Sequence, residues 1–327
     1  MMDSAEALYD KVREHYTAAS RGTSAEYSEA VAKSFGYSAD ELANIPQAAN
    51  LGLSCGNPLA IASLKEGETV LDFGCGAGFD VFLAAKRVGP SGRVIGIDMN
   101  DDMLARANQI LASSSREGSG SSSSSNISFL KANIASVPLP DGTADCVISN
   151  CVVNLVPPAD KPAVFAEMYR LLRPGARARV ALSDILAKRP LPEHLRTDLA
   201  LYVGCIAGAA QVAEYRVWME TAGFRDVTIV DTGADLNVYL ETDQDGKRKA
   251  AAGSCCVPAP PAVCCGAGAG ITAITASAPT PAPALIQGST STCAAAGSGC
   301  SARAGALPDK IDLNEFVGSY KIFAIKE

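Results

Sequence analysis

Short apolar runs alternate with helical patterns through the middle of the chain. The apolar runs are residues 69–73, 93–98, 127–130, 145–149 and 179–184. Between them lie stretches in which apolar positions have helical spacing, such as residues 101–112 and 160–173. Apolar runs this short, separated by helices, are typical of parallel strands that are covered on both faces. The pattern predicts an α/β fold in which a doubly wound, mostly parallel, Rossmann-like sheet carries helices on both sides.

The segments outside this core have other patterns. Residues 3–19 and 26–34 have amphipathic helical spacing, and the serine of SADELANI at 38–45 caps a further short helix. The last residues, IDLNEFVGSYKIFAIKE, return to the alternation of a strand. We therefore expect an N-terminal helical segment or lid at residues 1–50 and a cofactor-binding sheet domain at residues 51–187. A small C-terminal α+β substrate region would comprise residues 188–250 and 307–327, with an insertion at residues 251–306.

Two stretches have a composition that cannot bury much apolar area. Residues 113–126, SSSREGSGSSSSSN, are rich in serine and glycine and predict a flexible loop between a helix and a strand. Residues 251–306 combine alanine, proline, glycine, serine and cysteine with almost no aromatic residues. We expect this second stretch to be a disordered insertion that hangs from an edge of the C-terminal region.

Composition and charge exclude several classes of function. The 327 residues are 48% hydrophobic and 19% charged, as in globular proteins. A net charge of −7 argues against a surface that binds nucleic acid. The first residues are polar, and no apolar run approaches the roughly 20 residues that span a bilayer. We expect a cytoplasmic monomer with neither a nucleic-acid nor a membrane partner.

A glycine-rich turn and a following acidic residue predict a cofactor pocket. Gly74, Gly76 and Gly78 of VLDFGCGAGFD let the backbone approach a ligand closely, next to the unpaired N–H groups of a helix start. Asp98 ends the next strand, where a carboxylate can accept from both ribose hydroxyls, and Met99 would flank the adenine. The alternatives are a structural loop for the glycines and a helix cap for Asp98. The spacing matches neither the dinucleotide fingerprint nor a P-loop.

Eleven cysteines in a chain without a secretory signal predict free thiols. Cys151 follows a strand at the carboxyl edge of the sheet, where open α/β folds bind their ligands. Cys55 lies in the glycine-flanked loop NLGLSCGNPLA, and Cys205 lies between small residues in YVGCIAGAA. Three converging thiolates suit a thiophilic ion such as trivalent arsenic, whose lone pair could attack a methyl group. The alternative is that each is an ordinary buried cysteine, which is how we interpret Cys75 and Cys146.

Several longer stretches resemble the arsenite S-adenosylmethionine (SAM) methyltransferases, which belong to the class I methyltransferases. These stretches are ANLGLSCGNPLAIASLKEGETVLDFGCGAGFD, GIDMN, ISNCVVNLV, LRPGARARVALSDI and LPEHLRTDLALYVGCIAGA, in this order between about residues 38 and 240. The resemblance implies the class I methyltransferase fold. It also implies methylation of trivalent arsenic with SAM as the methyl donor, which would serve arsenic detoxification.

The resemblance also implies roles for particular residues. Cys55, Cys151 and Cys205 fall on the family's functional positions, as arsenic ligands and catalytic residues. The cofactor pocket would be formed by Asp72, Gly74, Cys75, Gly76, Gly78, Asp98, Met99, Asn133, Ile134 and Asn150. The expected partners are arsenite or its thiol conjugates and an external thiol reductant, glutathione or thioredoxin.

The chain departs from the family in ways that keep other interpretations open. Many members have a further cysteine upstream that can pair with the one matching Cys55, whereas this chain has none before it. Cys75 stands where members commonly have serine. The alternative functions are a methyltransferase of a small organic substrate, which would not need Cys151, and a thiol-rich metalloid-binding protein.

Two pairs of adjacent cysteines lie in the low-complexity stretch. The first pair is Cys255 and Cys256, and the second pair is Cys264 and Cys265. Adjacent thiols could capture arsenite before it is delivered to the main site. The alternative is that a segment without a core carries these cysteines incidentally.

Overall fold

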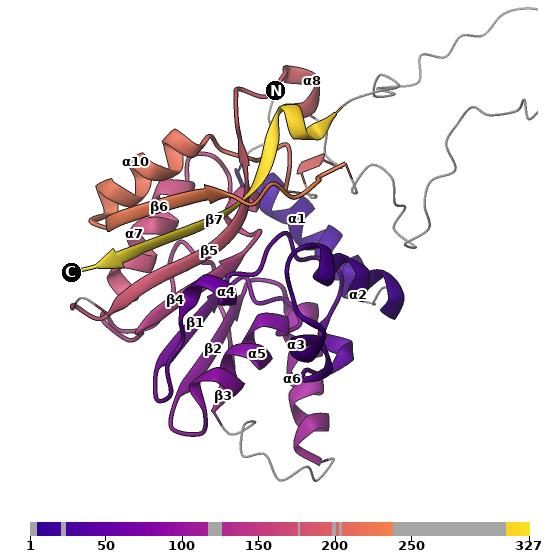
Figure 1. Ribbon diagram of the computed structural model, residues 1–327, viewed down its shortest axis with the longest axis vertical. Coiled ribbons are helices and arrows are strands. Elements are labelled where there is room, and N and C mark those ends of the chain that lie inside the picture. Colours follow the sequence, from indigo (N-terminus) through magenta and orange to yellow (C-terminus); the bar gives the residue numbers. More distant parts are fainter. Residues whose placement is uncertain are drawn as a thin grey trace, which may run out of the picture. The chain divides into compact units, whose positions relative to one another are not determined.

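The fold is built on a seven-stranded sheet, in which neighbouring strands lie in the order β3-β2-β1-β4-β5-β7-β6 (Figure 1). The computed structural model describes residues 5–20, 24–116, 126–175, 177–197, 201–202, 205–237 and 312–327. Strands β1 to β5 pair in parallel, whereas β7 is antiparallel to both β5 and β6. The predicted fold class, a doubly wound and mostly parallel α/β sheet, is confirmed.

The elements follow the apolar pattern of the sequence closely. The strands are β1 Thr69–Phe73, β2 Arg93–Asp98, β3 Ile127–Lys131, β4 Cys146–Asn150, β5 Ala178–Ala187, β6 Arg225–Asp231 and β7 Val317–Lys326. The α-helices are α1 Ala5–Ala19, α2 Ala25–Ser34, α3 Ala39–Ala43, α4 Leu59–Ala62, α5 Phe79–Val88, α6 Asp101–Arg116, α7 Lys161–Leu171, α8 Glu193–Arg196 and α10 Val212–Ala222. Short 3₁₀ turns are η1 Gln47–Ala49, η3 Val153–Leu155 and η4 Leu313–Glu315.

Each face of the sheet is covered by its own helices. Leu71 and Phe73 of β1 belong to an apolar cluster that includes side chains of α7 and α10. Val70 belongs to a second cluster, with side chains of α4 and α5. Because successive strand residues point to opposite faces, both faces must be apolar, which explains the continuous apolar runs.

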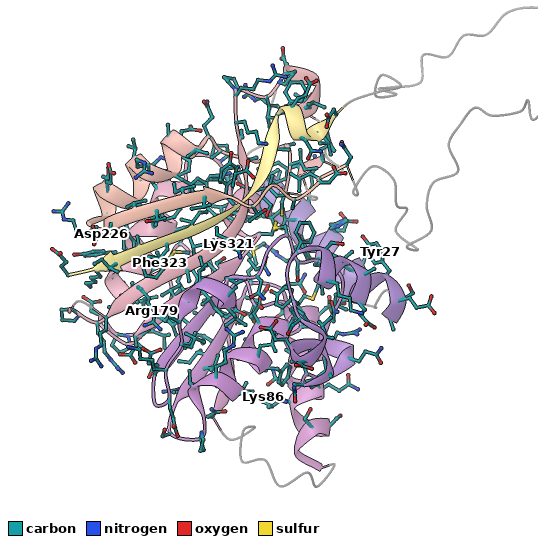
Figure 2. The ribbon with its side chains drawn as sticks, viewed as in Figure 1. Tyr27, Lys86, Arg179, Asp226, Lys321 and Phe323 are labelled. Carbon is teal, nitrogen blue, oxygen red and sulfur yellow. A yellow bond between two sulfur atoms is a disulfide. The ribbon has the colours of Figure 1, made fainter. Side chains whose placement is uncertain are left out.

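A buried ion pair fixes the start of β5. Arg179, labelled in Figure 2, is 7% exposed. Its Nη2 lies 2.8 Å from Oε2 of Glu68, which precedes β1. The same guanidinium donates to the main-chain oxygens of Ala62 and Ser63 at the end of α4. The pair therefore joins α4, the start of β1 and the start of β5 at the edge of the sheet opposite the carboxyl ends of its parallel strands.

The order of the strands places a crevice at the carboxyl ends of β1 and β4. Strand β1 pairs with β2 on one side and with β4 on the other, so the connections that leave β1 and β4 diverge. Ligands of open α/β sheets bind at such a point. Helix α1 lies at the same edge, because Asn100, after β2, donates to the main-chain oxygen of Arg13 at 2.9 Å.

The strand predicted in the last residues of the chain is confirmed. Strand β7 enters the same sheet between β5 and β6. Residues 117–125 of the predicted serine-rich loop lie outside the described residues, as does the whole of residues 251–306. Within the ranges that the structure describes, no helix has the length and the hydropathy of a membrane span.

The four cysteines predicted to capture arsenite also lie outside the described residues. They are Cys255, Cys256, Cys264 and Cys265. Their accessory role therefore stays a prediction from the sequence.

Candidate cofactor pocket and thiol site

The residues predicted to bind a cofactor surround one cavity at the carboxyl edge of the sheet. All of them line it except Gly78, which is the N-cap of α5. They come from four places in the chain: the end and turn of β1, the end of β2, the loop after β3 and the end of β4. The lining residues are Asp72, Gly74, Cys75, Gly76, Asp98, Met99, Asn133, Ile134 and Asn150.

The glycine turn has the conformation that the sequence predicted. Gly74, Gly76 and Gly78 have φ angles of +73°, +51° and +91°. A Cβ atom on Gly74 would lie 2.3 Å from Cγ2 of Val152, so the turn packs directly against the segment after β4. Only glycine combines this backbone conformation with this close approach.

Asp98 is fixed with its carboxylate at the cavity. Its Oδ2 accepts the N–H of Gly76 and its Oδ1 accepts the N–H of Asn100, both at 2.9 Å. Burial raises the pKa of Asp98, although these main-chain N–H groups counteract the rise. Each carboxylate oxygen has a further lone pair for a ligand hydroxyl. With the apolar side chains of Met103 and Ile134 in the same wall, the cavity suits the ribose and adenine of SAM.

Asn150 connects three segments around this cavity. Its Nδ2 lies 2.9 Å from the main-chain oxygen of Gly56, 3.0 Å from the Tyr37 hydroxyl and 3.1 Å from Oδ2 of Asp80. Its Oδ1 accepts the N–H of Cys55 at 3.3 Å. The amide predicted to be a cofactor residue therefore also positions the loop that carries the first thiol.

Asp80 is a functional candidate that the sequence reasoning missed. Its Oδ1 accepts the Tyr37 hydroxyl at 2.7 Å, and both side chains are buried. Burial raises the pKa of Asp80 to about 6, although the hydrogen bonds from Tyr37 and Asn150 lower it. A carboxylate in the first turn of the helix after the glycine turn was the available signal.

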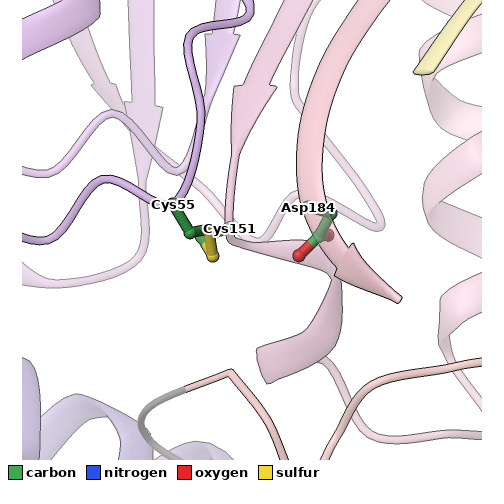
Figure 3. Close-up of side chains that lie close together, drawn as sticks. All are labelled: Cys55, Cys151 and Asp184. Carbon is green, nitrogen blue, oxygen red and sulfur yellow. A yellow bond between two sulfur atoms is a disulfide. The ribbon is translucent and has the colours of Figure 1, made fainter. Parts of the chain in front are cut away.

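The structure brings Cys55 and Cys151 into direct contact. The two residues form a disulfide, with their Cα atoms 5.8 Å apart (Figure 3). The prediction of free thiols is therefore wrong for this pair. The physical reason is that folding places the two Cβ atoms at the reach of a disulfide, despite 96 residues between them in the sequence. Cys75, Cys146 and Cys205 are free, as predicted, and all three are buried.

Cys205 lies beside this pair. Its Sγ donates to the main-chain oxygen of Cys151 at 2.9 Å, and its side chain is buried. Burial raises the pKa of the Cys205 thiol, and the nearby Asp184 carboxylate adds to the rise. Cys151 and Cys205 have φ angles of +60° and +64°. Non-glycine residues with positive φ are uncommon and cluster at functional sites, so the two angles support a functional role for Cys151 and Cys205.

The Asp184 carboxylate lies beside the disulfide. Its carboxylate oxygen and the sulfurs of Cys55 and Cys151 all lie within 4.8 Å of one another (Figure 3). Cys205 is not in that group of ligand atoms, so the structure places the third thiol at the edge of the cluster. The sequence signal for Asp184 was the one used for Asp98, a carboxylate at the end of an otherwise apolar run.

A buried amide connects the thiol-bearing segments. Asn154 of η3 is 0% exposed, and its Nδ2 donates to Oδ1 of Asp184 at 2.8 Å and to the main-chain oxygen of Cys205 at 3.2 Å. It also donates to the main-chain oxygen of Ile185. The Tyr215 hydroxyl donates to the other Asp184 oxygen at 2.8 Å. Burial raises the pKa of Asp184 to about 6, against the effect of these donors.

The surroundings of Cys75 and Cys146 are consistent with the packing role predicted for them. Burial raises the pKa of Cys75 well above its ordinary value and that of Cys146 to about 12. A Cβ on Gly96 of β2 would lie 2.8 Å from the Cys75 sulfur, so this thiol packs against the neighbouring strand. Cys75 also lines the cofactor cavity, where a small side chain is needed.

The sequence is similar to a family of methyltransferases. A family model described as a methyltransferase domain matches residues 64–223. An arsenite methyltransferase of Halobacterium salinarum is 42% identical over 210 residues, which cover 64% of this chain and 51% of that protein. The human arsenite methyltransferase is 35% identical over 173 residues, 52% of this chain and 44% of that protein. The chain thus spans about half the length of these curated relatives.

One solved structure is similar in sequence over a larger share of its own length. It is the arsenic (III) S-adenosylmethionine methyltransferase CrArsM from Chlamydomonas reinhardtii, at 31% identity. The match covers 64% of this chain and 68% of that chain, with a TM-score of 0.46.

Proposed function

The chain belongs to the arsenite S-adenosylmethionine methyltransferase family, and we propose that it transfers methyl groups from SAM to trivalent arsenic bound by cysteine thiolates. The observation that carries the proposal is the position of Cys151. This residue lines the cofactor cavity and also contacts both other candidate thiols. The acceptor atom and the methyl donor would therefore meet at one wall of the cavity.

The cofactor would be held by the carboxyl ends of β1, β2 and β4. The Asp98 carboxylate would accept the ribose hydroxyls, and Met99 and Ile134 would enclose the adenine. The start of α5 and the glycine turn would approach the ligand with main-chain N–H groups. SAM supplies a methyl group that its positive sulfur has already activated, so the chain's own task is to orient the acceptor and to exclude water.

The thiols would bind arsenic after the Cys55–Cys151 disulfide is reduced. Arsenous acid and three thiols give a trithiolate and three waters, As(OH)₃ + 3 RSH → As(SR)₃ + 3 H₂O. Each thiol proton leaves with an arsenic hydroxyl, so the raised pKa of the Cys205 thiol does not prevent binding. No general base is needed for methyl transfer either, because the attacking lone pair of arsenic carries no proton.

The remaining expectations stay proposals. An external thiol, glutathione or thioredoxin, would reduce the disulfide. The protein would work in the cytosol as a monomer. Arsenite or its thiol conjugates would be the substrate. Accessory arsenite ligands would be Cys255 and Cys256 together with Cys264 and Cys265, and residues 1–50 would form a lid on the cofactor domain.

Turnover of arsenite tests the proposal. The protein is incubated with SAM, glutathione and arsenite, and the arsenic species are separated by liquid chromatography with detection by mass spectrometry. We expect methylated arsenic from the wild type and from Cys146→Ala, a buried cysteine away from the cavity, but none from Cys151→Ala. Absence of methylated arsenic from a wild type that binds SAM would overturn the proposal, as would a fully active Cys151→Ala variant.

A further inference from the structure

A second cavity lies behind the segment that carries Cys205, and we propose that it binds the carboxylate of the thiol co-substrate, a small anionic thiol of the glutathione class. The inference rests on the proposed function, because that function requires an external thiol. The cavity shares no lining residue with the cofactor pocket, so both ligands can be bound together.

The cavity contains a buried cation with no carboxylate in contact. Lys161, the first residue of α7, is 2% exposed and lines the cavity. Its Nζ donates to the main-chain oxygens of Gly208 and Asn154, and it forms no salt bridge with any carboxylate in the described ranges. An ammonium has three N–H donors, so one donor remains for a ligand. The Asp184 and Glu214 carboxylates attract Lys161 from beyond ion-pair distance, yet burial still lowers the Lys161 pKa to about 8. A buried charge without a carboxylate in contact is costly, and an anion in the cavity would compensate it.

A second cation lies at the rim. Arg196 of α8 lines the cavity and is exposed, and its guanidinium has no hydrogen bond or ion pair with the part of the chain that the structure describes. The cavity has one carboxylate, Glu214, which already accepts the N–H of Gln211 at 2.8 Å in the capping box of α10. Two cations therefore face one engaged carboxylate, which favours an anionic ligand.

The cavity is connected to the thiol site through the chain. Tyr202 and Ala207 line it from either side of Cys205 in the sequence. Asn154 joins the two sites directly, because its main-chain oxygen accepts Lys161 and its side-chain amide donates to the Cys205 oxygen. A ligand held by Lys161 and Arg196 is therefore next to the segment that positions the third thiol.

The chemistry of the reaction explains why the anion should carry a thiol. The Cys55–Cys151 disulfide must be reduced before both sulfurs can bind arsenic. Two thiols do this: enzyme disulfide + 2 RSH → enzyme dithiol + RSSR, so the enzyme gains two hydrogens and the thiols are oxidised. Glutathione carries the required carboxylates, and Trp218 gives the cavity an apolar wall for the rest of such a molecule.

Kinetics with charged and uncharged thiols test the inference. Arsenite methylation is measured against glutathione and against 2-mercaptoethanol in the wild type, in Arg196→Ala and in the control Arg189→Ala. Arg189 is also exposed and lies in the same stretch of chain, but its guanidinium pairs with Glu315 at 2.9 Å and it is not among the residues that line the cavity. We expect Arg196→Ala to raise the KM for glutathione roughly twofold to fivefold, as for loss of one solvent-exposed ion pair. The rate of Arg196→Ala with 2-mercaptoethanol should equal that of the wild type. Arg189→Ala should equal the wild type with both thiols.

Direct binding gives a readout without turnover. By calorimetry without arsenite, S-methylglutathione, which has no thiol, should bind the wild type and bind Arg196→Ala more weakly, and glutathione diethyl ester should not bind. An unchanged glutathione KM in Arg196→Ala, or equal effects on both thiols, would overturn the inference. If the wild type makes no methylated arsenic even with 2-mercaptoethanol, it is the proposed function that fails.

Discussion

Replacement of Asn154 by alanine should destabilise the fold and disorganise the thiol site together. The change leaves Oδ1 of Asp184 and the main-chain oxygens of Ile185 and Cys205 without their amide donor, in a place that water does not reach. A hydrogen bond to a charged group contributes about 1.5–3 kcal/mol, and one between neutral groups about 1 kcal/mol. We therefore expect the free energy of unfolding to fall by about 3–5 kcal/mol.

The assay is urea denaturation of the reduced protein, followed by circular dichroism, with Asn126→Ala as the matched control. Asn126 is also buried, at 8% exposed, and its Nδ2 donates to the Gly89 oxygen at 2.7 Å, far from the thiols in the sequence. The control should lose about 1–2 kcal/mol. Arsenite affinity, measured under conditions in which both variants are folded, should fall for Asn154→Ala alone. A loss below about 1 kcal/mol for Asn154→Ala, or equal arsenite affinity in both variants, would refute the reasoning.

Three further changes probe the cofactor side. Asp98→Ala should raise the Kd for SAM by about 10-fold to 100-fold, because charged hydrogen bonds to the ribose are lost; calorimetry that gives an unchanged Kd would count against the assignment. Gly74→Ala should lower the free energy of unfolding by about 2–4 kcal/mol and abolish SAM binding, because its φ is +73° and the new methyl group would overlap Val152. The control Gly233→Ala, with a φ of +70° and no atom within 4 Å of the new methyl group, should lower it by only about 1 kcal/mol in the same urea denaturation assay. Asp80 has a folded-state pKa raised to about 6, so the folded protein binds more protons than the unfolded chain between about pH 4 and 6 and loses stability as the pH rises through that window. Unfolding free energies of Asp80→Asn should decline less steeply through this window, and the decline that remains should come from Asp184, whose pKa is also raised to about 6. Identical pH slopes for both proteins would show that the Asp80 carboxyl is not a cause.

Most of the fold could be predicted from the sequence, because its determinants are local. A strand buried on both faces must be apolar throughout, so the runs at 69–73 and 93–98 coincide with β1 and β2. The glycine turn could also be predicted, since a positive φ restricts the residue type. Asp98 could be predicted because a carboxylate at the end of the strand that follows a glycine turn is typical of a nucleoside pocket. The position of Cys151 followed from the topology alone.

The rest depends on contacts between distant segments. The Cys55–Cys151 disulfide joins residues 96 apart, and no spacing rule indicates it. Asn154 is one polar residue in an apolar stretch of the sequence, and only the fold shows that it donates to both Asp184 and Cys205. Lys161, at a helix start, reads as a solvated charge, yet it is buried because the 205–210 segment covers it.

The most direct test of the account is the number of sulfur atoms bound to arsenic. Arsenite is added to protein that has been reduced with a phosphine and freed of reductant, and the complex is measured by X-ray absorption at the arsenic K edge. The account predicts three sulfur neighbours in the wild type, contributed by Cys55, Cys151 and Cys205, and two in Cys205→Ala. Arsenic that keeps only oxygen neighbours in the wild type, or the same sulfur count in both proteins, would contradict it.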